Sequence, residues 1–118
     1  GITTILSAMK THSSNATVQE NGCGALWCLA TNNDKNRVTI AEAGGITTIL
    51  SAMKTHFSNA NVQKNGCAAL MNLAFNGNNK VTIAEKGGIT TILFAMKYHL
   101  DNANLQLYGC AVLWTLAE

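Results

Sequence analysis

Proline is absent from this 118-residue chain, and charged and aromatic residues are scarce, at 12% and 6%. Low charge combined with 47% apolar residues argues against intrinsic disorder, which requires the opposite balance. The formal net charge of +2 is too small to indicate nucleic acid or a membrane as the partner. No apolar run approaches the roughly 20 residues that span a bilayer, and the first residues lack the basic region of a signal peptide. We therefore expect one compact domain over residues 1–118.

An internal repeat organises the sequence. The segment GITTIL begins at residues 1, 45 and 88, so the successive spacings are 44 and 43 residues. A second segment follows in register in each unit and begins at Asn15, Asn59 and Asn102. Periods in the forties are typical of stacked helical units that each contact their neighbours. We divide the chain into repeat units 1–44, 45–87 and 88–118.

Each full unit is predicted to contain one short and two longer helices. Ile46, Ile49 and Leu50 follow helical spacing although β-branched residues surround them, and the same spacing recurs in the other units. Asn59 occupies an N-cap position before the apolar stripe of the next helix, whose small residues should let helices approach closely. The short helices, near residues 37–43 and 80–86, should end at the glycine pairs that follow. Because the chain opens on the second helix of a unit, eight helices are expected.

These segments resemble the armadillo repeat family over essentially the whole chain. The resemblance rests on Gly44-Gly45-Ile46 before a helix, on Val62-Gln63 at the start of the next, and on the runs 69–74 and 79–88. It implies an all-α fold, a right-handed α-solenoid of two full repeats plus one partial repeat. It also implies a protein-binding scaffold without enzymatic activity. The scaffold would hold an extended peptide or partner protein in a concave groove lined by the third helices.

The four cysteines indicate neither disulfides nor redox chemistry. Cys23, Cys67 and Cys110 occupy one repeat position, and stacked helices should lie roughly 8–10 Å apart, which exceeds the span of a disulfide. We expect these thiols, together with Cys28, to be free and buried as small hydrophobic groups. Unpaired thiols favour a reducing compartment, so the expected location is cytoplasmic.

No catalytic, cofactor or metal site is predicted. His12, His56 and His99 also occupy one repeat position, and each is expected to cap the free carbonyl groups at the end of its own helix. One repeat translation separates each pair of histidines, whereas zinc ligands must converge within ~2 Å of the metal. Residues that recur in register in every unit are more simply explained as structure than as catalytic groups.

The candidate groove residues come from projecting the third helix at 100° per residue. The side opposite the core stripe holds Glu20, Trp27, Cys28, Lys64, Met71, Asn72, Trp114 and Thr115. Trp27, Met71 and Trp114 would form either a ladder for a ligand, since tryptophan is enriched in binding hot spots, or a filling for the seam between units. Asn72 matches the family asparagine that clamps a peptide backbone. The other units lack this asparagine, and acidic residues are sparse, so recognition of basic localisation signals is not favoured.

The third unit departs from the other two by becoming more apolar. Its candidate interface residues are Phe94, Tyr98, Leu100, Leu107 and Tyr108. Contiguous apolar patches usually mark interfaces, so we expect these residues to bind another protein surface, with a homo-oligomer, most simply a dimer, as the first choice. Two alternatives remain. The chain could be a module that self-assembles through its uncapped solenoid ends, or a fragment of a longer solenoid whose next repeat covers the patch.

Overall fold

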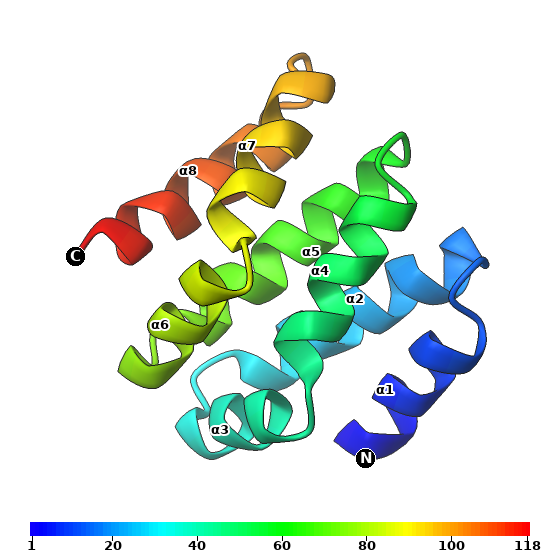
Figure 1. Cartoon of the computed structure of the whole chain (residues 1–118), viewed down its shortest axis with the longest axis vertical. Helices are drawn as coiled ribbons and strands as arrows, with labels where there is room; N and C mark the ends of the chain where they lie inside the picture. Colours follow the sequence, from blue (N-terminus) through cyan, green and yellow to red (C-terminus); the bar gives the residue numbers. More distant parts are fainter.

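The computed structural model describes all 118 residues and is wholly helical (Figure 1). Its eight helices are α1 (Ile2–Thr11), α2 (Ala16–Ala30), α3 (Asp34–Glu42), α4 (Gly45–Thr55), α5 (Ala60–Leu73), α6 (Gly77–Glu85), α7 (Gly88–Tyr98) and α8 (Ala103–Ala117). The predicted all-α fold is confirmed. None of these helices has the length and apolar character that crossing a membrane requires.

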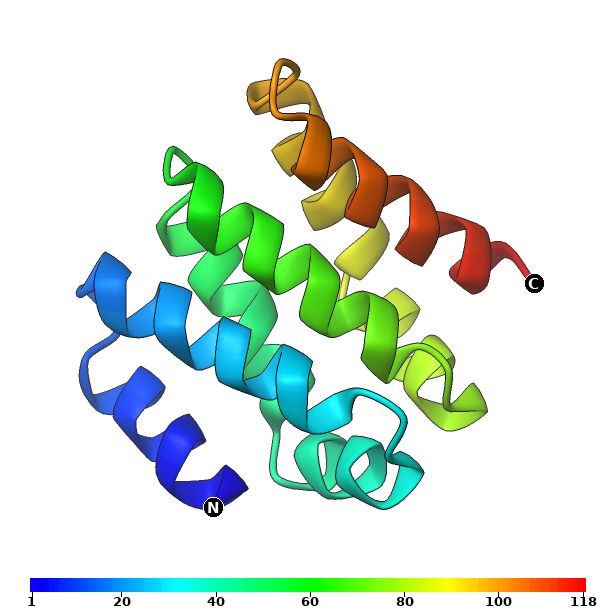
Figure 2. The same ribbon diagram turned by 180° about the vertical axis from the view of Figure 1, so that it is seen from behind.

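The longer helices form two layers. Helices α1, α4 and α7 lie side by side in one layer, and α2, α5 and α8 lie in the other (Figures 1 and 2). The short helices α3 and α6 connect one pair of longer helices to the next, and the chain termini lie at opposite ends of the stack (Figure 1). The most extensive contacts are those of α5 with α2 and with α8. The two layers therefore present two broad faces, which we call the α2–α5–α8 face and the α1–α4–α7 face.

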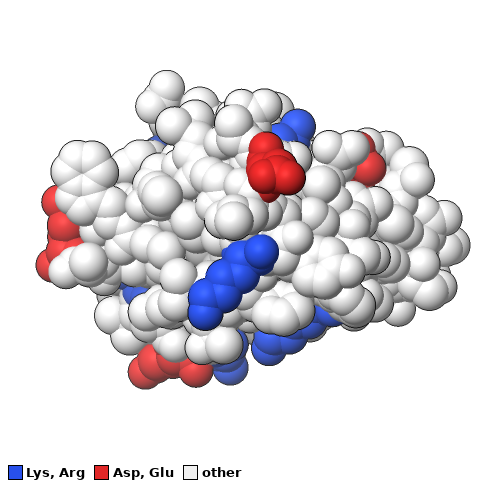
Figure 3. Space-filling model, turned by 90° about the horizontal axis from the view of Figure 1, so that it is seen from above, with Lys and Arg blue, Asp and Glu red and all other residues white.

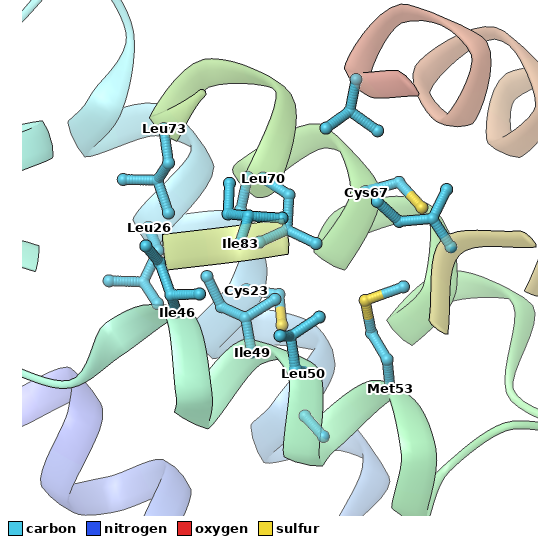
Figure 4. Close-up of a cluster of buried hydrophobic side chains, with 14 of the residues drawn as sticks. Cys23, Leu26, Ile46, Ile49, Leu50, Met53, Cys67, Leu70, Leu73 and Ile83 are labelled. Carbon is cyan, nitrogen blue, oxygen red and sulfur yellow. The ribbon is translucent and has the colours of Figure 1, made fainter. Parts of the chain in front are cut away.

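The hydrophobic core is centred on the middle helix pair. Ile46, Ile49 and Met53 of α4 and Leu70 of α5 belong to one cluster of buried side chains between the layers (Figure 4). Ile46 is 1% exposed, whereas Ile89, its equivalent in α7, is 42% exposed. The difference arises because a helix pair follows α4 and α5 but none follows α7 and α8. Position in the stack, rather than residue type, decides how much of each apolar side chain is buried.

The predicted starts of the third helices and ends of the short helices have the expected local causes, but the short helices begin three residues earlier than predicted, at Asp34 and Gly77, after the N-caps Asn33 and Asn76. Asn15, Asn59 and Asn102 each accept a hydrogen bond from the backbone N–H three residues later, at 3.0, 2.9 and 3.0 Å. These side chains satisfy N–H groups that have no partner within the helix. Gly44 and Gly87 adopt positive φ angles of 85° and 81° after the short helices, a conformation that favours glycine.

One glutamine joins the two layers within each unit, buried in the first two units and partly buried in the third. The Nε2 atom of Gln63 donates to the carbonyl oxygens of Met53 and His56 at 3.0 and 2.9 Å. Gln19 and Gln106 make the equivalent pair of bonds in the other two units. Each glutamine thereby satisfies carbonyl groups at the end of a second helix and fixes the start of the third. This role was not predicted, although one glutamine at the same place in every unit was the available signal.

The expectation that the histidines cap their own helices is wrong for two of them. Nε2 of His56 donates to the carbonyl oxygen of Ser13 at 2.8 Å, and Nε2 of His99 donates to that of Phe57 at 2.7 Å. In both cases the acceptor belongs to the preceding unit, because the helix ends are adjacent in the stack. These histidines therefore link successive units.

All four cysteines are free, as predicted, but only two are buried. Cys23 and Cys67 are enclosed between successive helices, and burial raises the pKa of each thiol to about 12. Cys110 is exposed because no helix stacks on that side of α8, and Cys28 is exposed on α2. The expectation of burial is therefore wrong for Cys28 and Cys110.

Candidate functional site on the α2–α5–α8 face

Two asparagines of α5 bind the backbone of α2. Asn65 donates from Nδ2 to the carbonyl oxygen of Glu20 at 2.9 Å. Asn72, two helical turns later, donates to the carbonyl oxygen of Trp27 at 3.2 Å and to Oγ1 of Thr31 at 2.9 Å. Both Asn72 bonds use Nδ2, and its side chain is buried. The asparagine that matches the family's peptide clamp thus holds two helices of this chain together.

A pair of aromatic rings bridges the first and third units. Trp27 of α2 and Tyr108 of α8 have ring centroids 5.1 Å apart and meet edge to face at 66°. Both side chains are partly buried and pack against the core. Since α5 lies between α2 and α8, the two rings meet across the middle unit. Tyr108 replaces the asparagine found at positions 21 and 65, and its ring makes this contact possible.

The burial of Ala68 indicates that side chains of the neighbouring helices cover the outer side of α5. The helical projection places Ala68 on the same side of α5 as Met71, away from the core stripe. Nevertheless Ala68 is 0% exposed and does not belong to the main core cluster. A residue on this side becomes fully buried only if side chains from the neighbouring helices cover it. The Trp27 and Tyr108 rings, which meet each other from α2 and α8 on either side of α5, are candidates for that cover.

The third unit presents the most accessible apolar side chains of this face. Trp114 is 73% exposed, and Leu107, two helical turns earlier on the same side of α8, is also largely exposed. Met71 on α5 is partly buried against the core. Of the predicted Trp27, Met71 and Trp114 ladder, only the Trp114 side chain stands mainly in solvent.

The other candidates on this face carry little charge. Glu20 and Lys64 are half-buried, and neither forms an ion pair. The one ion pair of the chain joins Arg37 to Asp34 on α3 at 3.8 Å. At the edge of the two layers, seen from above in Figure 3, lysine, arginine and acidic side chains are likewise sparse and scattered. Cys28 is exposed, and Thr115 is half-buried with its hydroxyl donating to the Ala111 carbonyl oxygen. No group of histidine, cysteine or acidic residues is arranged to hold a metal ion.

The structure distributes the five interface candidates over both faces. Tyr108 meets Trp27, whereas the Phe94 and Tyr98 rings pack together on α7 in the other layer, with centroids 6.0 Å apart. Leu107 lies on α8, and Leu100 is exposed in the turn after α7. The third unit therefore offers separate apolar surfaces on two sides of the molecule.

Helix pairs stacked in two layers and linked by short helices define a helical repeat protein. The sequence matches the family model described as LRRK2 ARM repeat over residues 2–118, and the chain belongs to this family. The resemblance to armadillo repeats is confirmed. No curated protein matches the sequence. The family indicates a repeat-type protein-interaction module.

Proposed function

We propose that this chain is a non-enzymatic scaffold that binds an extended peptide or partner protein along the α2–α5–α8 face. In this proposal the units wind into a right-handed solenoid of two full repeats and one partial repeat, with this face concave. The supporting observation is Trp114, a large aromatic side chain left 73% exposed on a face where buried Asn72 of α5 holds α2 in place. A rigid surface with an accessible tryptophan is the usual form of a binding hot spot. The expected setting is cytoplasmic.

The composition of the face favours an apolar ligand segment. Trp114 and Leu107 form an exposed stripe on α8, with Met71 on the neighbouring helix. Glu20 and Lys64 are the only charged candidates and have opposite signs, so a strongly charged ligand gains little there. In this proposal the ligand contacts Trp114, Leu107 and Met71, with Cys28 and Thr115 beside the path. The Trp27 and Tyr108 rings lie beneath the bound ligand, and Asn72 maintains the spacing between α2 and α5.

The test is peptide selection followed by substitution. Peptides selected from a random displayed library would be titrated by calorimetry against the parent chain and against Trp114→Ala. We expect Trp114→Ala to weaken binding about tenfold or more. The free energy of unfolding should stay unchanged, because this side chain is largely exposed. Val81→Ala, which truncates an exposed apolar side chain on α6, is the matched control and should bind as the parent does.

Two results would contradict this function. Selected peptides that bind equally to the parent and to Trp114→Ala would place the ligand elsewhere. A loss of stability of ~3–5 kcal/mol in Trp114→Ala would mean that the residue packs as a core side chain.

Self-assembly through the ends of the stack is the second candidate function. Ile89, Leu93 and Cys110 are exposed on α7 and α8, whereas their equivalents in the middle unit are buried against the next helix pair. The end of the stack thus repeats an interface that already exists twice within the chain. A second molecule could cover it and form a homo-oligomer. Light scattering that reports the monomer mass at every concentration would exclude this candidate.

A further inference from the structure

We propose that the α1–α4–α7 face carries a second docking site, which takes an acidic partner segment with an apolar side chain. The site is centred on Phe57, Phe94 and Tyr98. Phe57 lies edge to face with Tyr98 at 5.4 Å and with Phe94 at 6.2 Å between ring centroids. The three side chains are 43%, 53% and 52% exposed, so they meet on the surface rather than in the core. This site lies in the opposite helix layer from the proposed peptide-binding face.

A hollow adjoins these rings. It lies between α4 and α7, and its volume is about 340 Å³. Phe57 and Phe94 contribute aromatic walls, Thr90 and Thr91 contribute hydroxyl groups, and Lys54 contributes the only charge. The space accommodates an aliphatic or aromatic side chain, and the ammonium group of Lys54 attracts a neighbouring carboxylate.

The chain contains a polar version of the same hollow. Between α1 and α4 a hollow of about 240 Å³ is lined by Lys10, Thr47 and Thr48, which are the equivalents of Lys54, Thr90 and Thr91. Ser13 and Ser51 take the places of Phe57 and Phe94 in this first hollow, and Thr55 takes the place of Tyr98.

Stacking of the units does not require the rings, because the first pair of units stacks without them. Phe57 belongs to the second unit, and Phe94 and Tyr98 belong to the third. Phe57 of the second unit and Phe94 of the third therefore line one hollow, and Tyr98 packs against both rings. All three side chains remain about half-exposed. That convergence points to an external ligand.

The charged side chains of the α1–α4–α7 face favour a ligand of negative charge. Lys10, Lys54 and Lys97 lie in the last turns of α1, α4 and α7, and these three helices contain no acidic residue. The helix dipole stabilises a lysine at this end, so the lysines need no carboxylate partner within the chain. Asp101, in the turn after α7, is the one acidic residue beside the rings. A second molecule that docked by the same face would bring like charges together, so an acidic segment of a different protein fits better.

The experiment uses the blocked hexapeptide EELFEE as a probe, followed by backbone amide NMR shifts of the full chain. With up to about 5 mM peptide, we expect saturable shifts at Thr90, Thr91 and Phe94. The equivalent residues of the first hollow, Thr47, Thr48 and Ser51, should not shift. The charge-reversed peptide KKLFKK and the polar peptide EESSEE are expected to bind at least about tenfold more weakly.

Substitutions separate the aromatic and the charged contributions. Phe94→Ser with Tyr98→Thr restores the residues of α4, so the helix should fold, and the dissociation constant should rise about tenfold. Lys54→Gln should raise it about threefold, as expected for one exposed charge pair. Lys10→Gln, at the equivalent position of the polar hollow, is the matched control and should leave it unchanged.

Four results would overturn the proposal. They are the absence of shifts in this peptide range, equal shifts in both hollows, unchanged affinity in the Phe94→Ser, Tyr98→Thr variant, and equal binding of KKLFKK. Binding to vesicles of anionic phospholipid with no response to EELFEE would replace the proposal with a lipid surface. Self-association that disappears in the double variant would replace it with a contact between two copies of this chain.

Discussion

The ring of Trp27 meets that of Tyr108 at 5.1 Å, so a side chain of the first repeat unit touches one of the third. Stacked repeats usually gain stability only from contacts between adjacent units. Here an aromatic pair reaches across α5 and adds a contact between its two neighbours. The pair should make the three units unfold more cooperatively than adjacent contacts alone would.

The first prediction concerns this aromatic pair. In a Trp114→Phe background, Trp27 is the only tryptophan. Tyr108→Asn, which restores the residue of the other units, should then shift Trp27 emission to longer wavelength and increase its quenching by acrylamide. Stability should fall by about 0.5–1.5 kcal/mol, the usual contribution of an aromatic pair.

The matched control is Leu107→Lys in the same background. It also restores a residue of the second unit on α8, but it leaves both rings of the aromatic pair in place. Its emission should match that of the background protein. An unchanged spectrum in Tyr108→Asn would show that the Trp27 ring is not covered by Tyr108.

Asn72 is predicted to stabilise the folded protein by holding α5 to α2. Asn72→Ala removes two hydrogen bonds to α2 and leaves a cavity at a buried position, so the free energy of unfolding should fall by about 1–3 kcal/mol. Asn61→Ala, an exposed position on the same helix, should change it by less than about 0.5 kcal/mol. Chemical denaturation measures both values. Equal stabilities of the two variants would show that the Asn72 bonds contribute nothing.

Two glycines of similar helical position should respond oppositely to alanine. A Cβ atom on Gly45 would lie 2.7 Å from the backbone oxygen of Ile40, which cannot easily move. Gly45→Ala should therefore destabilise the protein by roughly 1–3 kcal/mol. At Gly77, the first residue of α6, an added Cβ atom would meet nothing within 4 Å, so Gly77→Ala should be neutral or stabilise by up to about 1 kcal/mol. Thermal unfolding of both variants checks the difference in sign.

The four thiols should fall into two kinetic classes. Cys28 and Cys110 are exposed and should react with a disulfide reagent in the folded protein. Cys23 and Cys67 should react only after denaturation, because they are buried and their thiolates are disfavoured, with each pKa raised to about 12. Mass spectrometry of the labelled protein counts the modified sites. Four rapid reactions under native conditions would contradict the burial of the last two.

The same two thiols predict a loss of stability at alkaline pH. In the unfolded chain they ionise near the ordinary thiol pKa of 9.0, whereas in the folded protein the pKa of each is about 12. Between these values the unfolded state binds fewer protons, so the free energy of unfolding falls as pH rises. Well below the unfolded pKa the effect is absent. Replacing both cysteines with alanine should flatten this part of the pH profile, and a profile as steep as that of the parent would contradict the assignment.

The helices could be predicted from the sequence because their causes are local. Helical spacing of apolar residues, an asparagine before each third helix and a glycine after each short helix act within a few residues of one another. The three asparagine caps and the positive φ angles of Gly44 and Gly87 are found where these signals lie. The repeat also indicated stacking, since no unit alone can bury its apolar stripe. The armadillo-type fold was therefore accessible from the residues alone.

The candidate sites depended on contacts between distant residues, which repeat spacing does not specify. Nearly identical segments behave differently by position: Ile46 is buried and Ile89 exposed because only the first is followed by another helix pair. His56 binds a carbonyl oxygen of the preceding unit, and Trp27 meets Tyr108 two units away. The residues that recur in every unit specify how each unit folds and packs against its neighbour. The relative positions and order of the helices in the stack decide which side chains meet and which remain exposed to a partner. Only the tertiary structure determines these positions.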